Sequence, residues 1–279
     1  MSRKRIELSI VSFLIIAVLA YAGAGLILSA TRVASAERTL NIVVSHQNVL
    51  NSTFNDLDSQ FSALSSGSAF NPQQAIVLVD RSIFNSEIAT KTINDDEMSL
   101  SGVTSQLDST RWLTMVGGTS LDREATRIGH AHNALGAART IASDKVADGH
   151  FWHSLYTSLA DLTMLNTQSG AGDLAAAKAT LGTMKTDVDQ AALQSTAPGL
   201  PAELHALMTD LQAFVVDYGK ELDAKQAGDD TAASGYQDAL NADLQKIGSY
   251  DIDKIGGEIN AFYKPLIDRF NTEIAAATS

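Results

Sequence analysis

The chain has 279 residues, of which 32 are acidic and 20 basic, giving a formal net charge of -12, and it contains no cysteine and four prolines. Without cysteine there are no disulfides, thiolate metal sites or cysteine nucleophiles, and an acidic chain without a basic block is not expected to bind nucleic acid. A hydrophobic content of 45% excludes a disordered chain, and the scarcity of proline and aromatic residues favours helices over sheets.

The N-terminus has the pattern of a membrane anchor. After a basic stub, residues 6–30 are apolar apart from Glu7 and scattered small polar residues, and no charge interrupts the run from Ile10 to Leu28. A helix needs about 20 apolar residues to cross the roughly 30 Å core of a bilayer. A signal peptide cleaved at Ala34-Ser35-Ala36 is the alternative, but its apolar region would be only about 7 to 15 residues long. Length therefore favours an uncleaved anchor.

The charges on either side of this run predict its orientation. Residues 3–5 are all basic, whereas Arg32, Glu37 and Arg38 follow the run. Because positive charge is retained on the cytoplasmic side, we expect a single-pass protein of the cell membrane with a cytoplasmic N-terminus. Its partner in the membrane is the lipid bilayer, contacted through residues 6–30, and the rest of the chain is extracytoplasmic.

A heptad seam follows the anchor. From Val33 to Leu64 apolar residues recur at alternating spacings of three and four, with neither Pro nor Gly to end the helix. Gln47 interrupts the seam at an a position, where a buried polar side chain would fix the register of a homodimer. Packing within one chain is the alternative that we favour. The candidate oligomer seam comprises Leu40, Val43, Gln47, Leu50, Phe54 and Leu57.

Two further helical regions are expected in the middle of the chain. Pro72 is placed to open the first of them. Asn94, followed by the acidic residues 95–97, has the pattern of a new N-cap, so this region is either two helices or one kinked helix. A turn at Gly117-Gly118 leads to the next helix, in which Gly149 indicates a break or bend, although the helix can continue through it.

The last third of the chain has the clearest pattern. A heptad stripe covers residues 174–191, and Pro201 opens another helix. One long final helix is expected over residues 236–274. Pro265 should kink it, because proline removes one backbone donor and crowds the preceding turn.

The predicted fold class is therefore all-α, with an N-terminal transmembrane helix followed by an elongated antiparallel helical bundle. Residues 1–30 form the cytoplasmic stub and anchor. Residues 31–170 form an N-terminal helical bundle, and residues 171–279 form a C-terminal three-helix unit. The alternative is that these last two parts share one core.

Two histidines have the spacing of helical metal ligands. His150 and His153 lie one turn apart on a predicted helix, and a third ligand would have to come from another helix. Neither belongs to a Glu-x-x-His pair, which excludes a ferritin-like di-iron centre. A metal-binding or hydrolytic ectodomain that uses this pair is retained as an alternative, and otherwise no cofactor is expected.

A local basic cluster is the candidate ligand site. Arg111, Trp112, Arg123, Arg127 and His130 surround the turn at residues 117–118. Arg123 and Arg127 are one helical turn apart on the same face. In an acidic domain such a patch could hold a carboxylate or an acidic partner, although salt bridges with neighbouring acidic residues explain it equally well.

The sequence lacks the usual signatures of an enzyme. There is no G-x-S-x-G, H-E-x-x-H, G-x-x-x-x-G-K-[ST] or G-x-G-x-x-G motif. We therefore expect a non-enzymatic protein that binds a protein partner or a small ligand, either as an accessory subunit or as a sensor-like scaffold.

Two family resemblances bear on this expectation. The basic stub, the apolar helix and the seam from Val33 to Leu64, with the helices up to about residue 165, resemble the extracytoplasmic four-helix-bundle sensor domains of chemoreceptors and sensor kinases. Such receptors return through the membrane, and no second apolar run follows here, so direct transmembrane signalling is not expected. The start at Ile6-Glu7-Leu8 resembles type IV pilin-like subunits, which makes a filament subunit a further alternative.

Overall fold

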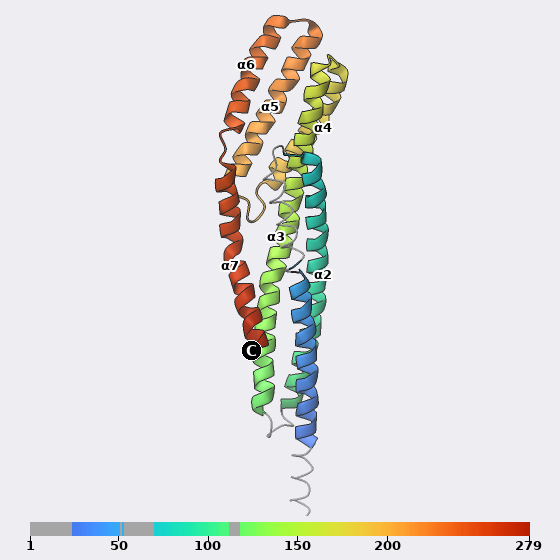
Figure 1. Ribbon diagram of the computed structural model, residues 1–279, viewed down its shortest axis with the longest axis vertical. Helices are drawn as coiled ribbons and strands as arrows, with labels where there is room; N and C mark the ends of the chain where they lie inside the picture. Colours follow the sequence, from blue (N-terminus) through green and yellow to red (C-terminus); the bar gives the residue numbers. More distant parts are fainter. Residues whose placement is uncertain (1–23, 51, 53–69, 112–117) are drawn as a thin grey trace, which may run out of the picture. The chain divides into compact units, whose positions relative to one another are not determined.

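The computed structural model describes residues 24–50, 52, 70–111 and 118–279. These residues form helices joined by short turns, and no strand occurs among them, so the predicted all-α class is confirmed. One helix covers residues 24–50. It is followed by α2 (Pro72–Thr110), α3 (Gly118–Gly170), α4 (Leu174–Gln194), α5 (Ala202–Ala227), α6 (Asp230–Ile247) and α7 (Ile252–Thr278) (Figure 1).

The predicted membrane anchor lies largely outside the described residues, which begin at residue 24. Among the helices that are described, none combines the length and the apolar character that crossing a bilayer requires. The span from Ile10 to Leu28 and its orientation stay predictions, as does the pilin-like interpretation of Glu7.

The expected helix start at Asn94 is wrong, because α2 is one helix of 39 residues from Pro72 to Thr110. The acidic residues that suggested an N-cap instead contact other helices. Asp96 is buried and accepts a hydrogen bond from Gln47, and Glu97 pairs with Arg139 of α3. Carboxylates at a helix start and carboxylates that join two helices look the same in sequence.

The expected break at Gly149 is also wrong, since α3 continues through it for 53 residues. Glycine is needed there for packing. A Cβ atom added at Gly149 would collide with the side chain of Ile83 on α2. The glycine therefore permits a close approach of two helices.

The final helix is divided, contrary to expectation. Residues 248–251 form a turn between α6 and α7, and the side chain of Asp251 caps the new helix by accepting a hydrogen bond of 2.9 Å from the Lys254 amide. Pro265 lies inside α7 as predicted.

The chain divides into two compact units. Unit 1 contains the described residues of Met1–Leu50, Lys91–Arg139 and Leu266–Ser279, and unit 2 contains those of Asn51–Thr90 and Thr140–Pro265. The division passes through α2, α3 and α7, each of which contributes a segment to both units, instead of following the expected boundary near Gly170.

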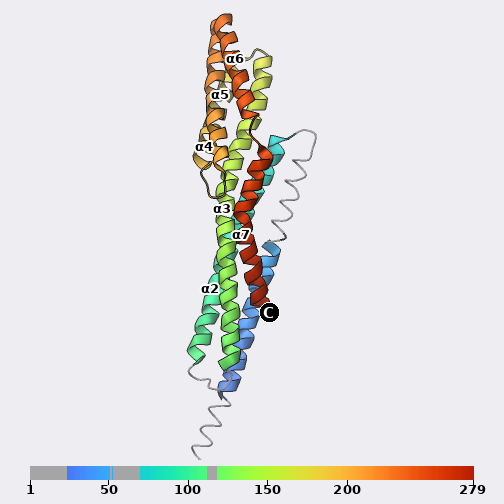
Figure 2. The same cartoon turned by 90° about the vertical axis from the view of Figure 1, so that its left-hand side faces the viewer.

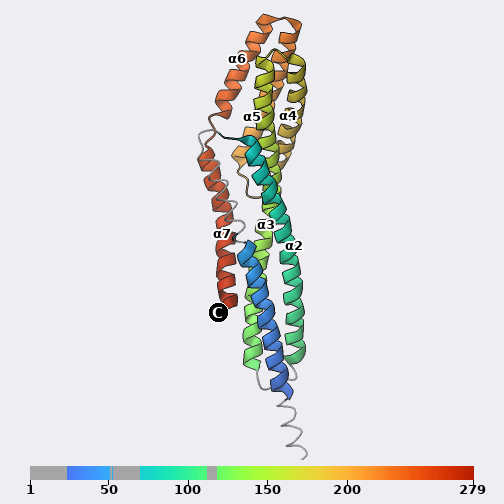
Figure 3. The same cartoon turned by 45° about the vertical axis from the view of Figure 1, so that its right-hand side comes forward.

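Neighbouring helices in unit 1 run antiparallel to one another. The helix over residues 24–50 contacts α2 through Arg32 with Gln106 and through Gln47 with Asp96, so residue numbers rise along one helix as they fall along the other (Figure 3). The contacts between α2 and α3 have the same antiparallel order, with Glu97 against Arg139 and Arg111 against Asp122. So do those between α3 and α7, with Arg127 against Ala277 and His130 against Glu273.

Unit 2 contains the larger apolar core. Within it α5 packs against both α4 and α6 (Figure 1), and the predicted stripe of α4 faces this core from Ala177 to Ala191. Two side-chain N-caps, Asp173 and Asp229, start α4 and α6. The core includes Phe151, Leu181, Met184, Leu204, Met208 and Leu222.

The contact at Gly149 yields a stability prediction. Gly149→Ala should lower the free energy of unfolding of the full chain by about 1 kcal/mol or more, because overpacking against Ile83 costs about 1–3 kcal/mol and exceeds the gain in helix propensity. Denaturant titration of the detergent-solubilised protein measures this change.

Two variants test its cause. Gly129→Ala, on an open face of the same helix, should raise stability by up to about 1 kcal/mol. Adding Ile83→Ala to Gly149→Ala should recover part of the loss. Equal effects of the two glycine substitutions would contradict the packing explanation.

Candidate functional site

The predicted basic cluster is matched by carboxylates of the same chain. Arg111 lies against Asp122 and 3.6 Å from Asp108, and Arg127 Nη1 lies 3.0 and 3.1 Å from the two carboxylate oxygens of Glu124. Arg123, the most exposed of these cations, is 3.6 Å from Glu124. Trp112 lies outside the described residues. The cations are therefore brought together, but with their own counterions.

Two residues of the cluster, Arg127 and His130, contact the C-terminal end of α7. Arg127 Nε donates a hydrogen bond of 2.9 Å to the carbonyl oxygen of Ala277, and His130 Nδ1 lies 2.7 Å from Glu273 Oε2. The pKa of Glu273 is lowered, chiefly by the hydrogen bond with His130. A helix C-terminus presents free carbonyl groups and a partial negative charge, so an arginine is a suitable partner for it. The end of α7 runs beside α3 (Figure 2), and Glu273 of α7 supplies the carboxylate that contacts His130.

The predicted metal pair has no assembled third ligand. His153 Nδ1 lies 2.7 Å from Asp80 Oδ1 of α2, and His150 is exposed. Within the described ranges, no three histidine, aspartate or glutamate side chains are arranged to hold a metal ion. His153 acts as a link between α2 and α3.

The described part of the oligomer seam is buried within one chain. Leu40, Val43 and Gln47 are almost fully buried, and Leu50 is half-buried. Gln47 Nε2 donates a hydrogen bond of 3.1 Å to Asp96 Oδ2, and His46 Nδ1 lies 2.9 Å from Asp96 Oδ1. The polar residue that suggested a dimer thus has its partner on α2 of the same chain. Phe54 and Leu57 lie outside the described residues.

A serine and a histidine meet in unit 2. Ser195 Oγ lies 2.8 Å from His205 Nδ1, but the hydroxyl is 2% exposed and donates its hydrogen to the Ala192 carbonyl oxygen at 2.7 Å. Ser195 therefore accepts from His205, the reverse of the arrangement in which histidine activates a serine nucleophile. The pair joins the end of α4 to α5.

The most perturbed carboxyl group in the described residues is Asp148 of α3, which sequence analysis did not select. Tyr263 of α7 donates a hydrogen bond of 2.6 Å to Asp148 Oδ2, and Lys145 Nζ lies 4.7 Å from the centre of the Tyr263 ring. Asp148 Oδ1 is buried without a hydrogen-bond partner among the described residues. Burial raises the pKa of Asp148 to about 6, which outweighs the opposing effects of Tyr263 and Lys145.

The turn before α5 lies against the side chain of Tyr263. Gly199 has a φ of 90°, and a Cβ there would come within 2.8 Å of the Tyr263 hydroxyl. Only glycine tolerates both conditions without strain. No spacing in the sequence links Asp148 with Tyr263, 115 residues later, so only the folded chain reveals the pair.

A row of apolar side chains is exposed on α2. Phe70 precedes the helix, and Val77, Phe84 and Ile88 continue the row at helical spacings with exposed fractions of 48, 59, 60 and 44%. Spacings of seven and four place Val77, Phe84 and Ile88 on one face of α2, and Phe70, just before the helix, has its ring centre 5.3 Å from that of Tyr156. We call this row the α2 stripe.

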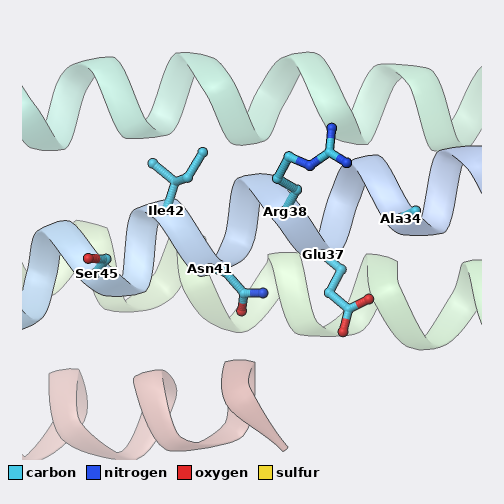
Figure 4. A pocket seen from close by; sticks show the side chains of 6 residues that line it. All are labelled: Ala34, Glu37, Arg38, Asn41, Ile42 and Ser45. Carbon is cyan, nitrogen blue, oxygen red and sulfur yellow. The ribbon is translucent and has the colours of Figure 1, made fainter.

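A shallow surface recess lies on the helix over residues 24–50. All of its lining residues come from that one helix: Ala34, Glu37, Arg38, Asn41, Ile42 and Ser45. Glu37 and Asn41 point to one side, and Arg38 and Ile42 to the other, so the polar groups do not converge on a common point (Figure 4). This recess is an exposed helix face and not an enclosed binding site.

No family model matches the chain, and neither a curated protein nor a solved structure matches it. The resemblances to sensor ectodomains and to pilin-like subunits stay predictions from the sequence pattern.

The environment of Asp148 predicts how stability depends on pH. Its folded-state pKa of about 6 lies above the ordinary value of 3.8, so the folded chain holds this proton to higher pH than the unfolded chain. The contribution of Asp148 to the free energy of unfolding therefore falls as pH rises from about 4 to about 6. Asp148→Asn should flatten this dependence and raise stability above pH 7 by no more than about 3 kcal/mol.

Denaturant titrations between about pH 4 and pH 8 measure this dependence. Asp238→Asn is the matched control, because Asp238 is exposed on α6, and it should leave the pH profile unchanged. A loss of stability above pH 7 in Asp148→Asn would show that the carboxylate stabilises the fold.

Proposed function

We propose that this chain is a non-enzymatic, membrane-anchored helical bundle that binds a helix of another protein on the extracytoplasmic side. The observation that carries the proposal is the α2 stripe. Exposed apolar rows on a folded domain are typical of interaction surfaces, and the helical positions i, i+7 and i+11 of Val77, Phe84 and Ile88 suit a second helix packed alongside.

The arrangement of charges favours a protein partner over a small acidic ligand. The cations selected from the sequence contact carboxylates or a carbonyl group of the same chain, as the pairs of Arg111 and Arg127 illustrate. A small acid would have to replace these intramolecular partners, whereas a helix can cover the α2 stripe without breaking any of the described contacts. The alternative of a second copy bound through the heptad seam is disfavoured, because Leu40, Val43 and Gln47 are already buried.

The membrane part of the proposal rests on the apolar run over residues 6–30 and on its flanking charges. Residues 24–30 of this run are described, and they are helical together with residues 31–50, which supports a helix that continues from the anchor into the bundle. Such a chain would hold unit 1 close to the membrane surface.

The α2 stripe can be tested by photo-crosslinking in the native host. A photoreactive phenylalanine analogue in place of Phe84 should give one adduct of defined mass, and Val77→Asp in the same chain should abolish it. The matched control is the analogue at Leu193, which is 76% exposed on α4 and should give no such adduct.

Two results would contradict the assignment. The same adduct at positions 84 and 193 would mean that contact is unspecific. An adduct of twice the mass of the chain would make the occupant a second copy of the chain instead of another protein.

The predicted topology can be tested separately, because the natural chain has no cysteine. Ser45→Cys, on an exposed face of the helix over residues 24–50, should react with a membrane-impermeant maleimide in intact cells. Ser2→Cys should react only after lysis. Labelling of Ser2→Cys in intact cells, or extraction of the protein by alkaline carbonate, would contradict the predicted anchor or its orientation.

A further inference from the structure

The end of α7 is lightly packed in unit 1. Of residues 266–279 only Ala277 is buried, whereas Leu266, Phe270 and Ile274 are half-buried and Ile267 is exposed. Apolar burial therefore contributes much less here than in α5, where nine hydrophobic residues are buried. Directed polar contacts must supply a large part of what keeps this segment on α3.

Those contacts come from one face of α3. Arg127 binds the carbonyl of Ala277, His130 binds the carboxylate of Glu273, and Asn133 Nδ2 lies 3.5 Å from the same carboxylate. Arg127, His130 and Asn133 are three residues apart, so their side chains follow one face of the helix. On α7 they contact the carboxylate of Glu273 and, one turn later, the carbonyl of Ala277.

The segment is also delimited within α7. The division between the two units falls directly after Pro265, where the helix lacks one backbone N–H donor and hence one intrahelical hydrogen bond. A helix can bend or separate at such a position with less disruption than elsewhere.

We propose that residues 266–279 are a releasable latch, seated on a face of α3 that binds acidic helix ends, and that an acidic helical segment presenting the same two groups competes with it. The competitor is defined by chemistry: a glutamate for His130 and Asn133, and a free helix-terminal carbonyl for Arg127. This face is distinct from the α2 stripe, so the inference goes beyond the proposed function.

Arg127 is well suited to such exchange. Its guanidinium also contacts Glu124, which is 1% exposed, at 3.0 Å. Glu124 holds Arg127 in position from within α3, so the donor to Ala277 stays oriented when α7 leaves. The face is therefore preorganised for a competing helix.

The latch can be followed in the full chain with two nitroxide labels. Because the chain lacks cysteine, Gly129→Cys on α3 and Ala275→Cys on α7, both exposed, provide the only attachment sites. The wild-type background should give a short label-to-label distance. Ala277→Phe, which cannot fit the fully buried position, should increase the ratio of separated to docked α7 about tenfold.

Charge variants separate the polar contact from packing. Glu273→Lys should also increase the separated fraction, because it places a cation opposite His130 and Arg127. Asn271→Lys is the control, since it introduces lysine at an exposed position of the same turn without removing a carboxylate, and it should leave the distance unchanged. Thermal melting of each variant checks that the rest of the chain remains folded.

Competition completes the test without any destabilising substitution. A synthetic peptide with the sequence of residues 266–279, added in excess to the labelled chain, should increase the separated population, and the same peptide with lysine for Glu273 should be much less effective. An unchanged distance with the peptide and in both latch variants would overturn the proposal. Neither result depends on whether a partner binds the α2 stripe.

Discussion

A carboxylate that leaves water needs donors, and in this chain those donors come from a neighbouring turn or from another helix. Asp96, Glu124 and Glu221 are almost fully buried, and each has a cation or an amide within reach. Leaving such a group without a partner costs about 1–3 kcal/mol or more. Pairing therefore restricts how the helices can slide past one another, because a shift by one turn would separate Asp96 from both His46 and Gln47. Apolar seams alone are less selective, since a heptad pattern fits several registers.

The same pairing of carboxylates with donors determines which groups of the chain are available to bind a ligand or a partner. The basic cluster that looked like a ligand site is neutralised by its own chain, with Glu124 on α3 and Glu273 on α7 as the carboxylates. The α2 stripe remains available for interaction, because Val77, Phe84 and Ile88 are exposed, although Phe70 contacts the ring of Tyr156. Asp148 is the carboxyl group whose pKa burial raises to about 6, and its Oδ1, like Glu221 Oε2, has no hydrogen-bond partner among the described residues.

Much of the fold was predictable because helix periodicity and end signals are local. The buried stripe of α4, the start of α5 after Pro201 and the start of α2 at Pro72 all follow from spacing and backbone preference. The errors at Asn94 and Gly149 have one cause: Asp96, Glu97 and Gly149 each contact a distant segment, and local sequence cannot distinguish such a contact from a helix end. The candidate ligand site stays a prediction. The sequence gathered Arg127 and His130, but it did not indicate that α7 would supply their partners.

The pairing of Gln47 with Asp96 offers the most direct test of the claim that buried carboxylates fix the helix register. A double-mutant cycle with Gln47→Leu and Asp96→Leu in the full chain, read by denaturant titration, isolates their coupling. We expect each single variant to lose about 1–3 kcal/mol of unfolding free energy and the double variant to lose less than their sum, because it leaves no unpaired buried group. Losses that simply add would contradict the account.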